Sequence, residues 1–186
     1  MRIIAGELKG RRLRTPDDDR VRPTTDKVKE AVFSMIAPWL YESVVADLFA
    51  GTGNLGLEAV SRGASRVYFV DKDRRSIALI RENVSYCKVE NRCEILWSDY
   101  HSALSKIEEP VDIVFLDPPY RRGILTDALE AVTEADFLSE GGIVVAEHAA
   151  DEILPETFGG LTLIKKKKYG KIGISVYENA AVSDEK

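Results

Sequence analysis

The sequence is poor in the residues that build covalent or metal-held scaffolds. Its 186 residues include two cysteines and two histidines. Cys87 and Cys93 fit neither a CxxC motif nor a disulfide framework, so we expect two packing residues in a protein of the reducing cytosol. His101 and His148 are too isolated in the sequence to predict a metal site.

Long apolar runs are also lacking. No run approaches the roughly 18 residues that a membrane span requires, and the amino terminus has no apolar core of a signal peptide. The apolar fraction of 45% and the charged fraction of 31% are typical of a soluble globular protein. We therefore expect a cytoplasmic protein with room for one full core and with neither a membrane nor a metal partner.

Charge is unevenly distributed along the chain, whose net charge is −5. Residues 1–29 contain nine basic and five acidic residues and carry +4, whereas the remainder, with 17 basic and 26 acidic residues, carries −9. A second basic run, Lys165 to Lys168, is followed by Lys171. Basic segments on an acidic protein are compatible with a polyanionic partner at one face. A lone lysine run, however, is more commonly a solvated surface.

The amino-terminal segment predicts a small hairpin followed by a helix. Residues 2–4 and 11–14 can pair across a glycine-flanked turn, with the basic side chains of the second arm on one face. A helix is expected to begin at Thr24 or Thr25, either of which can cap it. It should end near Pro38, because the residue before a proline disfavours the helical region.

Three parts of the chain follow from composition and pattern. Residues 1–22 are expected to form a basic hairpin extension, residues 23–179 the main domain, and residues 180–186 a flexible polar tail.

From residue 44 onward, apolar segments of strand length alternate with helical patterns. Continuous apolar strands that alternate with amphipathic helices indicate a parallel sheet covered on both faces. Two later segments, separated by Tyr169-Gly170-Lys171, indicate an antiparallel carboxy-terminal hairpin at the sheet edge. The predicted fold is α/β with a seven-stranded, mostly parallel sheet. The strands are expected at residues 44–49, 66–70, 93–97, 111–116, 142–147, 161–168 and 172–177, and the helices at 54–62, 74–86, 101–106 and 124–135.

Polar residues follow the first expected strand, where ligands bind in an open α/β sheet. Gly51, Gly53 and Gly56 form a GxGxxG loop between strand and helix, which allows a ligand to approach the backbone closely. Asp47 lies just before this loop. A carboxylate there would repel a pyrophosphate on the helix terminus and would suit a cationic or amino-bearing ligand. This favours S-adenosylmethionine over NAD.

The next three strands also end in an acid. Asp71 suits hydrogen bonds to ribose hydroxyls, and Asp99 could accept from an adenine amino group. Either one alone is equally well explained as a helix N-cap. The fourth strand ends at Asp117-Pro118-Pro119-Tyr120, where the prolines stiffen the backbone and an acid and a ring could hold a planar ligand.

These motifs, in this order, resemble the class I S-adenosylmethionine-dependent methyltransferases, in which (D/N)PP(Y/F) marks enzymes that methylate exocyclic or amide nitrogens. Residues 22–28, Arg-Pro-Thr-Thr-Asp-Lys-Val, together with Phe33, resemble the RsmD family more closely. The start Arg-Ile-Ile-Ala-Gly at residues 2–6 and the late Tyr-Gly-Lys at residues 169–171 add to this resemblance. That family consists of bacterial 16S ribosomal RNA guanine-N2 methyltransferases, and the similarity covers nearly the whole chain.

The resemblance implies a Rossmann-like fold, S-adenosylmethionine as cofactor, and a monomer that acts on 16S rRNA in an assembled or assembling 30S particle. Asp117 and the Pro118 carbonyl would accept from the guanine amine, and Tyr120 would stack on the unpaired or flipped base. The expected cofactor residues are Asp47, Gly51, Gly53, Gly56, Asp71 and Asp99. The expected RNA-binding residues are Arg11, Arg12, Arg14 and Arg22.

Other functions remain open at this point. DPPY-like corners also serve enzymes that methylate DNA adenine N6 or protein glutamine, although a DNA enzyme usually carries a target-recognition insertion that this chain lacks. A nicotinamide-dependent oxidoreductase would use a similar glycine loop, but Asp47 argues against it. A non-enzymatic RNA-binding protein could also have kept the fold.

Overall fold

The computed structural model describes residues 1–16, 26–120 and 123–180. Arg22, the two threonines expected to cap the first helix, and nearly all of the expected tail lie outside these ranges. Within them, no helix is both long enough and apolar enough to cross a membrane.

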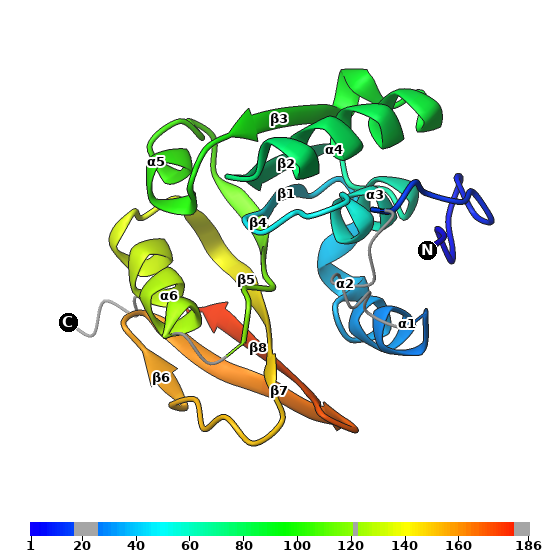
Figure 1. Ribbon diagram of the computed structural model, residues 1–186. Coiled ribbons are helices and arrows are strands. Elements are labelled where there is room, and N and C mark those ends of the chain that lie inside the picture. The colour runs from blue at the N-terminus through cyan, green and yellow to red at the C-terminus, as the bar shows by residue number, and fades with distance from the viewer. Residues whose placement is uncertain (17–25, 121–122, 181–186) are drawn as a thin grey trace.

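A single twisted sheet of eight strands organises the chain, in the order β3-β2-β1-β4-β5-β8-β7-β6 (Figure 1). Neighbours from β3 to β5 are parallel, and β8, β7 and β6 are added antiparallel. The predicted class is confirmed, but the predicted count of seven strands is wrong. The additional strand has only two residues, too few for a pattern. The strands are β1 Val44–Asp47, β2 Arg66–Asp71, β3 Cys93–Trp97, β4 Val111–Leu116, β5 Leu138–Ala149, β6 Thr157–Phe158, β7 Leu161–Tyr169 and β8 Ile172–Asn179.

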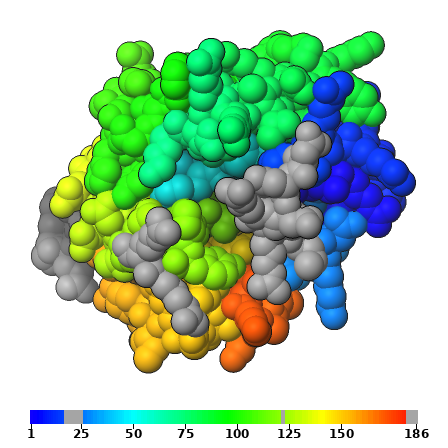
Figure 2. All heavy atoms as spheres, viewed as in Figure 1, coloured from blue at the N-terminus to red at the C-terminus, as the bar shows by residue number. Residues whose placement is uncertain are grey.

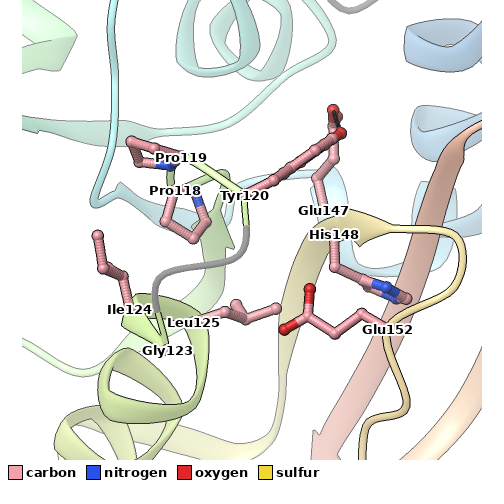
Figure 3. Close-up of a pocket in the computed structure, with 9 residues that line it drawn as sticks. All are labelled: Pro118, Pro119, Tyr120, Gly123, Ile124, Leu125, Glu147, His148 and Glu152. Carbon is pink, nitrogen blue, oxygen red and sulfur yellow. Dashed lines mark hydrogen bonds between the residues drawn. The ribbon is translucent and has the colours of Figure 1, made fainter.

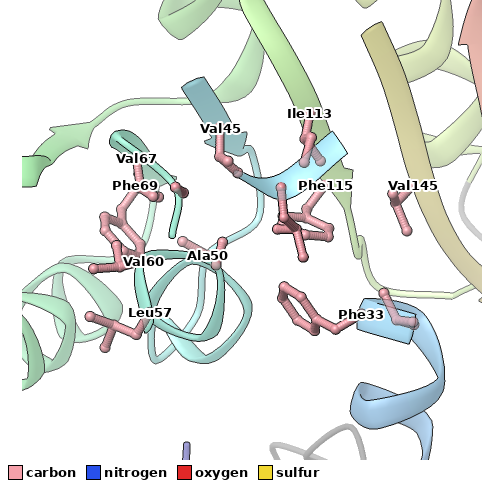
Figure 4. Packing of buried hydrophobic residues seen from close by; sticks show 14 of the residues in the cluster. Phe33, Val45, Ala50, Leu57, Val60, Val67, Phe69, Ile113, Phe115 and Val145 are labelled. Carbon is pink, nitrogen blue, oxygen red and sulfur yellow. The ribbon is translucent and has the colours of Figure 1, made fainter. Parts of the chain in front are cut away.

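Helices cover both faces of the sheet and bury two apolar clusters. One cluster joins the sheet to α1, α2, α3 and α4, and the other joins it to α5 and α6. In the first cluster the ring of Phe33 lies against that of Phe115, with centroids 5.7 Å apart (Figure 4). The helices are α1 Asp26–Met35, α2 Ala37–Leu40, α3 Asn54–Ser61, α4 Arg74–Cys87, α5 Tyr100–Leu104 and α6 Ile124–Glu134, with a 3₁₀ turn at Glu90–Arg92.

The helix near Pro38 differs from the prediction. Helix α1 already ends at Met35, and the proline lies in the first turn of the short helix α2 instead of stopping a helix. A proline is tolerated there because the first helical N–H groups have no intrahelical acceptor.

The amino-terminal segment is packed onto the body of the protein (Figure 2). Its two expected arms do pair, through an antiparallel bridge between Arg2 and Arg12 and through hydrogen bonds from the Ile3 N–H to the Arg11 carbonyl (2.9 Å) and from the Leu13 N–H to the Met1 carbonyl (3.1 Å), although neither arm forms an extended strand. The apolar side chains of Ile3, Leu8 and Leu13 are buried in the same cluster as α1, α3 and α4. The division at residue 22 remains a prediction, but the described part of this segment shares its core with the sheet.

A buried carboxylate on α3 holds the amino-terminal segment in place. Glu58 is fully buried and accepts hydrogen bonds from the backbone N–H groups of Ile4 (2.8 Å) and Ala5 (3.0 Å). Lys29 Nζ lies 3.0 Å from one of its oxygens, and Arg62 Nε lies 2.8 Å from the other. Burial alone would raise the pKa of Glu58, but the Ile4 N–H and the Lys29 charge lower it below its ordinary value. The carboxylate is therefore ionised and fully bonded.

Removing Lys29, the buried one of the two cations that contact Glu58, should destabilise the fold strongly even though Arg62 remains. Lys29→Met leaves the buried Glu58 charge without its ammonium partner, and we expect the free energy of unfolding to fall by about 3 kcal/mol or more. Urea denaturation measures this change. Lys27→Met, an exposed position on the same helix, is the matched control and should change stability little. Similar stabilities for the two variants would contradict the anchoring role of Glu58.

Candidate cofactor and acceptor site

The three glycines after β1 have different surroundings. Gly51 (φ +56°) and Gly53 (φ +79°) adopt left-handed conformations, and no atom lies within 4 Å of the place where a Gly51 side chain would begin. Gly56 lies instead within α3, on the side that packs on β2, where a Cβ would come within 2.3 Å of the Phe69 ring. The loop is therefore open to a ligand at Gly51, whereas Gly56 lets the helix pack closely on the sheet.

Asp47 is a buried acid that lacks a full set of partners. Its Oδ2 accepts a long hydrogen bond from the Gly56 N–H (3.3 Å), and its Oδ1 has no hydrogen-bond partner among the described residues. Burial, with a further contribution from Asp71, raises the pKa of Asp47 to about 7. A buried carboxylate in this condition is complementary to a cationic or N–H-bearing ligand group.

Asp71 ties the glycine loop to the end of β2. Its Oδ2 accepts from the Gly51 N–H (2.9 Å), and its Oδ1 accepts from the Asp73 N–H (2.8 Å). A ribose hydroxyl that bonded to Asp71 would therefore share carboxylate oxygens that already accept from backbone N–H groups. The arrangement fixes the position of Asp71 beside Gly51, while the contact with ribose remains a prediction.

Asp99 is the N-cap of α5. It accepts hydrogen bonds from the Ser102 N–H (3.0 Å) and the Ser102 hydroxyl (2.8 Å), and these bonds lower the pKa of its carboxyl group. This is the capping alternative that the sequence had left open. An adenine contact by Asp99 remains a prediction.

The Asp-Pro-Pro-Tyr corner follows β4 directly beside the end of β1. Asp47 pairs with Phe115 in the register of the two strands, so that Asp117 begins the loop two residues further on. Asp117 is half-buried and Pro118 is buried. Burial, the charge of Glu147 and the charge of Asp47 raise the pKa of Asp117 well above its ordinary value. The expected cofactor acid and the expected catalytic acid therefore lie in one electrostatic environment.

Glu147 of β5 is a site residue that the sequence reasoning missed. Its side chain is 9% exposed, and its Oε1 accepts a 2.7 Å hydrogen bond from the hydroxyl of Tyr120 (Figure 3). Its position could have identified it, because the fifth predicted strand, residues 142–147, also ends in an acid. A pocket here is lined by Pro118, Pro119, Tyr120, Gly123, Ile124, Leu125, Glu147, His148 and Glu152.

His148 lines this pocket but is already engaged. Its Nδ1 lies 2.8 Å from the Ala149 carbonyl oxygen, and its Nε2 lies 2.9 Å from the Ser175 hydroxyl. The residue is 1% exposed. These contacts assign it to the connection between β5 and β8. Among the described residues, no three His, Cys, Asp or Glu side chains are grouped so that they could hold a metal ion.

Two of the expected RNA-binding arginines already bond to other groups of the protein. Arg11 donates to the Tyr86 carbonyl (2.9 Å), and Arg14 pairs with Glu82 (3.0 Å). Arg12 is exposed. Their role in binding RNA remains a prediction.

The sheet order, the glycine loop after β1 and the acidic proline corner after β4 give the Rossmann-like fold of class I methyltransferases. A family model described as "Conserved hypothetical protein 95" matches residues 1–178. The chain belongs to this family, which is the RsmD family that its motifs resemble.

Individual relatives match over nearly their full length. The chain is 40% identical to the protein YlbH of Bacillus subtilis, covering 96% of this chain and 98% of that one. It is 33% identical to the Ribosomal RNA small subunit methyltransferase D of Escherichia coli, covering 97% and 91%. The solved structure of the Escherichia coli protein yhhF superposes with a TM-score of 0.87 at 32% identity, covering 97% and 98%.

The raised pKa of Asp47 should appear in the pH dependence of stability. The folded chain keeps the Asp47 proton up to about pH 7, whereas the unfolded chain releases it near the ordinary value of 3.8. The folded state therefore binds more protons between these values, so the free energy of unfolding should fall as pH rises through this range. This difference in the pKa of Asp47 between the folded and unfolded chain corresponds to a decrease of at most about 4 kcal/mol in the free energy of unfolding.

Denaturant unfolding at several pH values between these limits measures the effect. Asp47→Asn should remove part of the decrease with pH, while Asp136→Asn, which neutralises an exposed acid just before the amino end of β5, should keep it. A profile of Asp47→Asn that superimposes on the wild-type profile would show that Asp47 is not the titrating group.

Proposed function

We propose that this chain transfers a methyl group from S-adenosylmethionine to the exocyclic N2 of a guanine in 16S rRNA. The observation that carries the proposal is the juxtaposition of an unsatisfied buried carboxylate, Asp47, with the rigid acidic corner at Asp117 on the adjacent strand. Membership of the RsmD family and the name of the Escherichia coli relative support rRNA as the substrate.

The residues around the glycine loop fit this cofactor. Oδ1 of Asp47 has no partner among the described residues, and an ammonium or sulfonium group would supply the missing positive charge. A dinucleotide would instead bring a pyrophosphate towards the same carboxylate. Gly51 leaves the loop open, and Asp71 fixes its backbone. When bound, S-adenosylmethionine supplies an electrophilic methyl carbon.

The corner provides acceptors for an amino group. A guanine amine is a weak nucleophile because its lone pair is delocalised into the ring. The Asp117 carboxylate and the Pro118 carbonyl would each accept one of its N–H groups and orient the nitrogen, and a proline offers a carbonyl without a competing N–H. Because its pKa is raised, the ionised Asp117 is also a better proton acceptor than an exposed aspartate. Positioning and electrostatics supply most of the acceleration.

Tyr120 and Glu147 would hold the base. The hydrogen bond from the Tyr120 hydroxyl to Glu147 fixes the ring at the mouth of the corner, ready to stack on a planar ligand. A paired guanine cannot present its amine to this position, so the target is an unpaired or flipped base. We place the reaction in the cytoplasm, on an assembled or assembling 30S particle and with a monomeric enzyme, as the family resemblance implies.

Asp117→Ala tests the proposed reaction. Without the carboxylate, transfer of labelled methyl to small ribosomal subunits that lack the modification should fall by about 10²–10⁴-fold. Binding of S-adenosylhomocysteine, measured by calorimetry, should stay close to wild type. Asp136→Asn removes an exposed carboxylate at a left-handed position that asparagine tolerates, and it should leave transfer unchanged. Near-wild-type turnover in Asp117→Ala would overturn the mechanism.

The Tyr120–Glu147 bond gives a second test. Tyr120→Ala loses the stacking surface and should weaken kcat/KM by an amount equivalent to about 1–3 kcal/mol, whereas Tyr120→Phe keeps the ring and should lose less. Tyr120→Phe and Glu147→Leu remove the same hydrogen bond, so the double variant should be no worse than the poorer single variant. Equal losses for the two Tyr120 variants, or additive losses in the double variant, would contradict these roles.

A further inference from the structure

The β7–β8 hairpin carries four exposed lysines, Lys166, Lys167, Lys168 and Lys171. Within the described part of the chain, none of their ammonium groups makes a hydrogen bond or an ion pair. The preceding Lys165 differs, since its Nζ donates to the Met35 carbonyl (2.7 Å) and lies 5.1 Å from the centroid of the Trp39 ring. The four lysines, called here the hairpin lysines, form a concentrated positive charge on a chain of net charge −5.

Strand pairing places Lys168 and Lys171 beside the acceptor pocket, whereas Lys167, which pairs with Ile174, lies on the opposite face of the sheet from Lys168. The start of β8 pairs with the end of β5, where Ile172 faces Ala149 and the Ala150 N–H donates to the Lys171 carbonyl (3.0 Å). Lys168 pairs with Gly173, which in turn pairs with the pocket residue His148. Directly paired residues share a face of the sheet, so Lys168 lies on the His148 face at two strand spacings, about 10 Å away.

The hairpin is a firm support for these charges. Tyr169 and Ile172 pack against the first apolar cluster on either side of the turn. Gly173 lies against the His148 ring so closely that a Cβ would come within 2.4 Å of it. In Figure 2 the orange-red atoms of the hairpin lie at the surface in the lower right of the view. The lysines are therefore displayed from an anchored strand pair.

The acids of the pocket explain why cations such as the hairpin lysines are needed outside it. Asp47, Asp117 and Glu147 gather three acids at the ends of three neighbouring strands, and these acids, ionised or protonated, offer no cation to a phosphate. A polyanion that delivers one base to this pocket must therefore be held by cations outside it. Arg11 and Arg14 already bond to protein groups, whereas the ammonium groups of the hairpin lysines make no hydrogen bond or ion pair with any residue that the structure describes.

We propose that the hairpin lysines form an RNA-backbone binding surface that holds the phosphates flanking the target nucleotide. This inference rests on the proposed function, because it takes rRNA as the substrate. Phosphate contacts of this kind position the nucleic acid without reading its sequence. The hairpin would set the register of the strand, and the corner would select the base.

Lys168→Gln/Lys171→Gln tests the surface. The matched control is Arg81→Gln/Lys88→Gln, which removes two exposed charges from α4 and its C-cap, over β2 and β3 at the opposite edge of the sheet. The Kd for an unmodified 16S rRNA transcript is measured by fluorescence anisotropy over a range of salt concentrations. In the hairpin variant we expect a weaker Kd and a slope of log Kd against log salt reduced by about 2, one for each lost phosphate contact.

Each outcome separates the two proposals. The control variant should keep the wild-type slope, and both variants should bind S-adenosylhomocysteine as the wild type does. A hairpin variant with the wild-type slope, or an equal loss in both variants, would overturn the RNA-backbone surface. A hairpin variant that binds small ribosomal subunits more weakly, but keeps the wild-type salt slope on the transcript, would indicate that the lysines contact a ribosomal protein. This result would also overturn the RNA-backbone surface. Failure of the wild type to methylate any rRNA would instead overturn the proposed function.

Discussion

The crowding of carboxylates at one edge of the sheet is the constraint on which the site depends. Parallel strands bring their carboxyl ends together, so Asp47, Asp117 and Glu147 meet at the ends of β1, β4 and β5. Burial raises the pKa of both aspartates, with a further contribution from Asp71 at Asp47 and from Glu147 and Asp47 at Asp117. Such a site favours cations and N–H donors and rejects phosphate. The same constraint explains an amino-bearing cofactor, an amine acceptor and basic residues kept outside the pocket.

The precision of this edge depends on buried contacts behind it. Helix α3 starts in the glycine loop and carries Glu58, which binds the amino-terminal segment and Lys29 of α1. The absence of a side chain at Gly56 allows α3 to approach Phe69 of β2, and the backbone N–H of Gly56 donates a hydrogen bond to Asp47. Loop, helix and amino-terminal segment therefore form one packed unit. A change at Lys29 is expected to reach the cofactor loop through these contacts.

Much of this arrangement was predictable from the sequence, because apolar strands and strand-end acids are local patterns. The class of fold and the succession of acids at the strand ends follow from such patterns. Other features depend on tertiary contacts. The two residues of β6 have no periodicity, Glu147 belongs to no motif, and the pairing of Arg14 with Glu82 joins distant segments. Asp99 shows the limit most clearly, since one acid at a strand end serves equally as ligand or N-cap.

The identity of the methylated nucleoside tests the central claim most directly. The protein would be incubated with labelled S-adenosylmethionine and small ribosomal subunits from cells without this methyltransferase, and the rRNA digested and analysed by mass spectrometry. We predict N2-methylguanosine at a single position of 16S rRNA. Methylation of adenine or of protein glutamine, or no incorporation by folded protein that binds S-adenosylhomocysteine, would contradict a corner built to orient a guanine amine.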